Sequence, residues 1–191
     1  MNINEMITER ITLPSYLDYQ YYNCLEKNQI LINDDIRDDL IELAVIPLMQ
    51  MDEDKNIEHI TVFLNTYGGD IYAGMNLVAA LERAKTPITI HILGVAASMG
   101  IYIAMAKSDY IKTICSPYSV GLIHAGTYFN NGDLNAVRDA FEFNEHYEAL
   151  LKEYVLTHSK ITEELYNKIE RKEHWMDANT MLEYGIVDEI I

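Results

Sequence analysis

The sequence predicts an α/β fold in which a mainly parallel sheet is covered by helices. Short apolar, β-branched segments alternate along the chain with longer segments whose apolar residues recur at helical spacing. The strand candidates are apolar throughout, as is typical of parallel strands buried on both faces. The chain has 191 residues, 49% of them hydrophobic, which is enough for one sizeable core. We therefore expect one domain spanning residues 1–191.

The first half of the chain supplies two strand–helix pairs after a segment without a clear pattern. Residues 1–23 are weakly periodic, and we expect an N-terminal arm that orders only against a neighbour. Residues 29–33 form a short apolar strand candidate, and residues 34–51 predict an amphipathic helix behind an acidic cap. The β-branched run 59–65 predicts a strand. Residues 70–84 predict a helix that ends in basic residues before a proline.

The second half of the chain continues the alternation. Residues 88–94 predict a buried strand and residues 98–107 a short apolar helix. Further strands are expected at residues 110–115 and 119–124, and a long helix at residues 133–158. Two shorter helices are expected near 162–172 and 177–184.

Composition excludes several classes of partner. The formal charge of -16 argues against binding to nucleic acid or to an anionic membrane surface, both of which require a cationic face. No segment resembles a secretion signal or a membrane span, and Cys24 and Cys115 are interpreted as free thiols in a reducing compartment. We therefore expect a cytoplasmic protein. No histidine pair has metal-ligand spacing and no phosphate loop is present, so no metal or other cofactor is expected.

Three strand ends carry residues suited to chemistry, and in α/β folds ligands gather at the carboxyl ends of strands. In "NTYGGD" (65–70), paired glycines allow a tight turn and leave backbone amides unshielded. In "GVAASMG" (94–100), Ser98 is either the cap of the following helix or a nucleophile. Its small neighbours Gly94, Ala96 and Ala97 would clear the approach to the hydroxyl.

The third strand end, "GLIHAG" (121–126), carries His124, which is either a structural residue or a general base. Of the other histidines, His91 lies within a predicted strand. The remaining four are expected on the surface: His59, His146, His158 and His174.

The three motifs together, in this order and spacing, resemble one family. "FLNTYGGDIYAGMNLVAAL", "GVAASMG", "LIHAG" and the closing "DANTMLEYGIVDEII" resemble the proteolytic subunit of the Clp protease, ClpP, and its phage-encoded relatives. The resemblance covers the chain from about residue 20 to the C-terminus. It implies the ClpP/crotonase fold and serine endopeptidase activity on unfolded polypeptides.

The resemblance also implies the roles of individual residues. Ser98 attacks the scissile carbonyl, His124 transfers the proton, and the backbone amides of Gly69 and Met99 hold the oxyanion. Counting back from the Tyr-Gly pair of the closing motif places Glu173 where the family has its catalytic aspartate. Asp177 is an alternative carboxylate at a position where the family has a serine that caps a helix.

The sequence departs from the family at further points. Tyr67 replaces the proline that precedes the glycine pair, so the turn beside the substrate is expected to be looser or more aromatic. The N-terminal arm does not resemble the family's axial loop. Docking to an AAA+ Clp ATPase is therefore a possible partnership that the resemblance alone does not establish.

The family assembles as two face-to-face heptameric rings, a tetradecamer that encloses the active sites. Residues 133–158 would be the helix that joins the rings, because their apolar residues exceed what one neighbouring layer needs. Four alternatives remain open: an inactive structural ring subunit, a phage head-maturation protease, an acyl-CoA crotonase, and a Ser-Lys peptidase.

Overall fold

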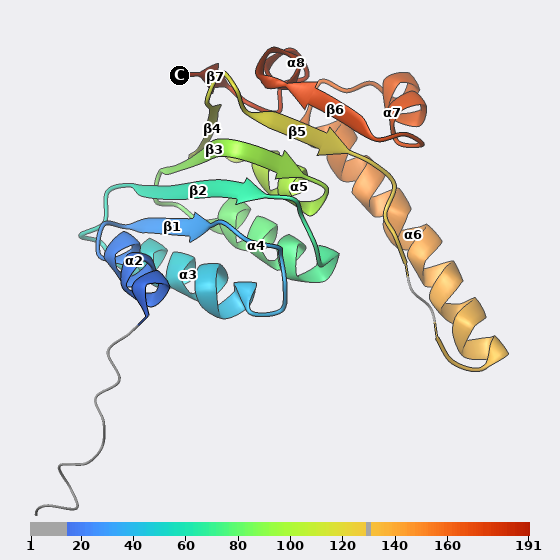
Figure 1. Ribbon diagram of the computed structural model, residues 1–191, viewed down its shortest axis with the longest axis horizontal. Helices are drawn as coiled ribbons and strands as arrows, with labels where there is room; N and C mark the ends of the chain where they lie inside the picture. The colour runs from blue at the N-terminus through green and yellow to red at the C-terminus, as the bar shows by residue number, and fades with distance from the viewer. Residues whose placement is uncertain (1–14, 129–130) are drawn as a thin grey trace, which may run out of the picture.

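A sheet of seven strands forms the centre of the computed structural model within the residues that it describes, 15–128 and 131–191 (Figure 1). The strand order is β1-β2-β3-β4-β7, with β5 paired to β3 and β6 paired to β5. The strands are β1 (Gln29–Ile32), β2 (Ile60–Thr66), β3 (Ile88–Ala97), β4 (Ile111–Cys115), β5 (Val120–Ile123), β6 (His174–Asp177) and β7 (Glu189–Ile190). Only β5 and β6 pair antiparallel among the described strands, so the predicted α/β fold with a mainly parallel sheet is confirmed.

The helices lie mostly on one side of the sheet or beyond its end. They are α2 (Tyr16–Leu25), the π-helical turn η1 (Ile41–Val45), α3 (Ile46–Glu53), α4 (Ile71–Arg83), α5 (Met99–Ala104), α6 (Leu134–His158), α7 (Glu163–Ile169) and α8 (Ala178–Glu183). In Figure 1, α3 and α4 lie along one face of β1–β3, and α6 extends away from the sheet. No helix of the described segments is both long and apolar enough to cross a membrane.

The core lies between the central strands and α4. Alternate residues of β2 are fully buried, and Leu77, Val78 and Leu81 of α4 are buried beneath them. Gly74 of α4 allows close approach to α5, because a Cβ atom there would collide with the Met99 side chain. The packing therefore places the start of α5 directly against α4.

Strand β3 continues three residues beyond the predicted end at residue 94. Val95, Ala96 and Ala97 pair with β5, and Ala96 also pairs with β2 beyond an irregularity in the register. At that irregularity the Val95 amide donates to the Asn65 side-chain oxygen at 3.0 Å, and a Cβ on Gly94 would lie 2.8 Å from the same oxygen. Gly94 therefore serves the packing of β3 against the Asn65 side chain.

The helix predicted over residues 34–51 begins later and contains a π-helical turn. Ile36 instead forms an isolated parallel bridge with Gly69. Pro47 lacks an amide hydrogen and cannot bond to the carbonyl four residues earlier, that of Leu43. The Tyr21 hydroxyl donates to this carbonyl at 3.0 Å, so a side chain replaces the missing backbone donor.

Three short elements escape prediction from the sequence pattern. Residues 16–25, within the expected arm, form α2, which starts with a capping box between Ser15 and Asp18. Strands β6 and β7 have four and two residues, too few to show a period. The predicted helices near 162–172 and 177–184 correspond to α7 and α8.

Replacing the buried Leu77 tests the assigned core. Its side chain is 0% exposed, so Leu77→Ala should lower the free energy of unfolding by about 2–5 kcal/mol through lost burial and a cavity. Leu17→Ala is the matched control, because Leu17 is 77% exposed and should cost less than about 0.5 kcal/mol. Denaturant titration followed by circular dichroism measures both, and equal losses would contradict this packing.

Candidate active site

Ser98 lies at the turn from β3 to α5 in a conformation that serine rarely adopts. Its φ is 53° and its ψ is −122°, and Asn28 is the other non-glycine residue with positive φ in the described chain. Such a backbone conformation costs on the order of 1–3 kcal/mol and is concentrated at functional sites. The Ser98 hydroxyl makes no capping hydrogen bond to α5, so the N-cap interpretation does not account for this side chain.

The backbone of Ser98 is held by the neighbouring strand. Its amide donates to the Leu122 carbonyl of β5 at 3.0 Å, and its carbonyl accepts from the Ile101 amide at 3.0 Å. The main chain is therefore fixed on both sides, which sets the position from which the half-buried Ser98 side chain projects at the strand end.

The glycine turn after β2 packs directly against the Ser98 turn. Gly68 and Gly69 have φ values of 101° and 146°, which favour glycine. A Cβ on Gly68 would lie 2.6 Å from the Ser98 Cβ and 2.9 Å from the Met99 nitrogen. Glycine is therefore required at position 68 for the two turns to touch.

Gly69 is constrained by the chain before α3. The Ile36 amide donates to the Gly68 carbonyl and the Asp70 amide donates to the Ile36 carbonyl, both at 2.8 Å. A Cβ on Gly69 would collide with the Ile36 backbone. The backbone of Ile36 therefore requires glycine at position 69.

The amides of Gly69 and Met99 are placed to act as donors. The bridge to Ile36 uses the Gly68 carbonyl and the Asp70 amide and leaves the Gly69 amide outside it. Met99 is the first residue of α5, where backbone amides have no partner within the helix. These two amides lie on turns that are in contact with each other.

One cleft brings the predicted residues together. Ser98, His124 and Gly69 all line a cleft of about 400 Å³. His124 follows directly after β5, and its buried Nε2 atom has no hydrogen-bond partner in the described chain. No hydrogen bond joins Ser98 to His124 among the described residues, so the cleft contains both groups without linking them.

The two candidate carboxylates occupy different positions relative to His124. The pairing of β5 with β6 ends at Ile123 and His174, and His124 and Glu173 are the adjacent residues just beyond this last pair. Directly opposed residues of an antiparallel pair lie within side-chain reach. Glu173 is exposed and has no hydrogen bond to His124 in the described chain.

Asp177 serves a different purpose. It pairs with Val120, four residues before His124, which corresponds to about 14 Å along the strand. Its carboxylate accepts from the Thr180 amide at 2.8 Å and caps α8, and this bond holds the pKa of Asp177 below its usual value. The register separates this alternative carboxylate from the imidazole.

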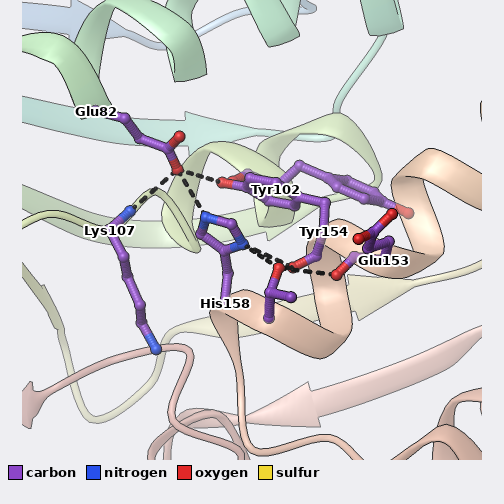
Figure 2. A network of polar contacts seen from close by, with 7 residues as sticks. Glu82, Tyr102, Lys107, Glu153, Tyr154 and His158 are labelled. Carbon is purple, nitrogen blue, oxygen red and sulfur yellow. Dashed lines mark hydrogen bonds and ion pairs between the residues drawn. The ribbon is translucent and has the colours of Figure 1, made fainter.

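The C-terminal end of α6 is held in place by a polar network that was not predicted from the sequence. Figure 2 shows the Glu82 carboxylate of α4 between Lys107, Tyr154 and His158. His158 Nε2 lies 3.0 Å from Glu82 Oε1, and its ring stacks on Tyr154 with centroids 3.9 Å apart. The Tyr154 hydroxyl also donates to the Tyr102 carbonyl of α5 at 3.1 Å.

This network corrects the expectation that His158 lies free on the surface. The imidazole is half-buried and connects α6 to the helix pair beside the cleft. Because its partners come from distant parts of the chain, no local pattern marks it. His174 is likewise half-buried, and burial lowers its pKa.

Two further features bear on the site. Tyr67, in place of the family's proline, is 71% exposed beside the glycine turn. Within residues 15–128 and 131–191, no three side chains of the His, Cys, Asp and Glu types are arranged to hold a metal ion.

An α/β fold with a serine and a histidine in one cleft at the strand ends fits a serine-type peptidase. The sequence model of the Clp protease family matches residues 15–191. The chain therefore belongs to the Clp protease family, whose members are serine-type peptidases.

Individual relatives are distant but match over most of their length. The chain is 29% identical over 180 residues to the ATP-dependent Clp protease proteolytic subunit of Lactococcus lactis subsp. cremoris (strain SK11), covering 91% of this chain and 88% of the relative. The corresponding subunit of Streptococcus sanguinis (strain SK36) is also 29% identical, with 91% and 89% covered. The chloroplastic proteolytic subunit 3 of Arabidopsis thaliana is 28% identical over 182 residues, with 94% and 58% covered.

Proposed function

We propose that the chain is the proteolytic subunit of a Clp-type protease and hydrolyses peptide bonds of unfolded polypeptides with Ser98 as nucleophile. The observation that carries this proposal is the Ser98 turn. Its positive φ, its hydroxyl outside any helix cap and its place in one cleft with His124 are not explained by folding alone.

The proposed reaction follows from the groups in the cleft. Ser98 Oγ attacks the carbonyl carbon while His124 Nε2 takes the hydroxyl proton, and the imidazolium then gives this proton to the leaving amine. Water releases the acyl group by the same proton transfers in reverse order. The unpartnered Nε2 atom is available for this role, and we propose that its hydrogen bond to Ser98 forms in the substrate complex.

The oxyanion is assigned to the amides of Gly69 and Met99. Both donors belong to turns whose geometry is fixed before substrate binds, through the Ile36 bridge and through the first turn of α5. Donors that need no reorganisation stabilise developing charge most effectively.

Glu173 is proposed to orient the imidazole and to stabilise its cation. The β5–β6 register supports this assignment, because Glu173 and His124 lie just beyond its last pair and Asp177 lies several residues away. The glutamate is one methylene longer than the family's aspartate, and its exposed position leaves room for the longer side chain.

Replacing Ser98 tests the nucleophile. Ser98→Ala should reduce hydrolysis of a small fluorogenic peptide by about 10³-fold or more, since no other hydroxyl takes its place. A fluorophosphonate should label the parent protein and not the variant. Ser116→Ala, a matched control away from the cleft, should keep both signals, and retained turnover by the Ser98 variant would refute the assignment.

Replacing each of the two carboxylates with alanine in turn tests which of them orients the His124 imidazole. Glu173→Ala should lower kcat/KM by about 10²-fold or more. It should also lower kcat with little change in KM, because the carboxylate stabilises the imidazolium that forms in the transition state.

Asp177→Ala is the control for this pair, and it should weaken the α8 cap while leaving kcat and KM of the folded enzyme unchanged. An unchanged rate for Glu173→Ala would remove this residue from the mechanism.

Assembly is proposed to follow the family, as two stacked heptameric rings that form a tetradecamer. Four apolar side chains of α6 are 46% to 74% exposed: Leu134, Phe141, Phe143 and Leu150. Residues seven apart share a helix face, so Leu134 and Phe141 lie on one side of α6 and Phe143 and Leu150 lie on the opposite side. Exposed apolar side chains on a helix that extends away from the sheet suit contact with a second ring (Figure 1). The names of the relatives, which include "ATP-dependent", support a Clp ATPase of the AAA+ type as partner.

The proposed contact between the two heptameric rings is tested at Phe143, an exposed apolar residue of α6. Phe143→Glu, on a side chain that is 52% exposed, should divide the assembly into smaller particles, because it places charge in an apolar contact. Glu142→Gln on the same helix should leave the size unchanged. Analytical ultracentrifugation measures both, and an unaltered assembly for Phe143→Glu would contradict the role of this residue.

A further inference from the structure

A second cavity adjoins the cleft that holds Ser98. This inner cavity has a volume of about 270 Å³ and shares three lining residues with the cleft, His124, Gly126 and Tyr128. Tyr128 therefore forms part of the boundary between the two spaces. A substrate residue whose carbonyl lies at Ser98 has its side chain next to this boundary.

Aromatic rings form one wall of the route from the cleft to the inner cavity. Tyr72 of α4 and Tyr147 of α6 line the cleft with Tyr128, and the Tyr72 and Tyr147 ring centroids are 5.3 Å apart. The two rings pack against each other at this distance, and a cation above an outward tyrosine face would be attracted to it.

The inner cavity presents unpaired negative charge. Three carboxylates line it, those of Glu145, Glu148 and Glu170, and none forms an ion pair with another described residue. The one cationic residue in the lining is Lys152, whose ammonium group is bound by Glu163 at 2.7 Å and by Asn167 at 3.0 Å.

The pKa of Glu148 reflects its burial and the neighbouring carboxylates. Its side chain is half-buried, and burial together with the charges of Glu170 and Glu145 raises its pKa. A cation that entered the cavity would stabilise the charged form of Glu148. It would compensate for the hydration lost on burial, and it would offset the negative charges of Glu145 and Glu170.

The hydroxyl of Tyr128 is a second feature that lacks a partner. Its oxygen is buried and has no hydrogen bond within the described chain. Burial, the Glu148 charge and the neighbouring tyrosines raise the pKa of Tyr128 to about 12, so the phenol stays protonated and neutral. Its lone pairs can accept a hydrogen bond from an N–H group of a ligand at this boundary.

We infer that the cleft selects peptides with arginine or lysine at the residue that supplies the attacked carbonyl. The apolar stem of that side chain lies along the Tyr72, Tyr128 and Tyr147 rings, and its charged end meets Glu148. This specificity rests on the proposed peptidase function of the same cleft. Leucine would fill the aromatic wall and leave the carboxylates unpaired, and glutamate would add a like charge to them.

Binding and cleavage are measured separately, so that a failure of catalysis is distinguished from a failure of specificity. Product-like peptides that end in arginine, leucine or glutamate are titrated into the assembled Ser98→Ala protein by fluorescence anisotropy. The arginine peptide should bind about tenfold more tightly than the leucine peptide, and the glutamate peptide should bind most weakly. Equal affinity for arginine and leucine would overturn the inference.

Cleavage by the parent protein gives the second measurement. Matched fluorogenic substrates that differ at this one residue should show the same order in kcat/KM. If the arginine peptide is preferred in binding and no substrate is cleaved, the specificity stands and the peptidase function fails. If all substrates are cleaved without preference for arginine, the function stands and the specificity fails.

Variants of α6 test whether Glu148 is responsible for the preference for arginine over leucine. Glu148→Gln should lower the arginine-to-leucine ratio of kcat/KM about tenfold, and Glu148→Lys should shift the preference toward glutamate. Glu142→Gln, exposed on the same helix and outside both cavities, should leave the ratio unchanged. Equal losses on arginine and leucine substrates in Glu148→Gln would assign Glu148 a structural role and refute the inference.

Discussion

The contact between two turns, one after β2 and one after β3, is the constraint on which the rest of the site depends. Parallel strands end at the same edge of a sheet, so the glycine turn and the serine turn meet there. Gly68 touches Ser98 closely enough to exclude any side chain. The positive φ of Ser98 is tolerated because its backbone is bonded to Leu122 and Ile101 on either side. A buried core surrounding these turns supplies the stability that such strain consumes.

The C-terminal end of α6 is the second constraint, because its polar contacts hold the helix against α4 and α5. His158 and Tyr154 bind Glu82 of α4 and the backbone of α5 at one end of the helix (Figure 2). About three turns nearer its start, Tyr147 and Glu148 reach the cleft and the inner cavity. One helix therefore joins the substrate-binding wall to the elements that carry Ser98, while its exposed apolar residues remain available for assembly.

The paired glycines, the serine at a strand end and the histidine at the next were recognisable in the sequence because each lies in a local motif of six or seven residues. The main strands and α4 were likewise predictable, since burial on a sheet or a helix leaves a periodic pattern. The end of β3 was not, because the strand continues at Val95 by pairing with β5 and by donating to the Asn65 side chain of β2, both from distant parts of the chain. Residues 16–25 form a helix from cap geometry rather than from periodicity.

Other properties arise only when distant segments meet. Ile36 dictates glycine at position 69, and the β5–β6 register separates Glu173 from Asp177 as neighbours of the imidazole. The carboxylates that line the cavity beside Tyr128 belong to α6 and to the residue that follows α7, and no spacing along the chain links them to Ser98. The type and spacing of neighbouring residues reveal which chemical groups a local motif carries. The surroundings of each group depend on packing between distant segments, and this packing leaves no pattern along a single sequence.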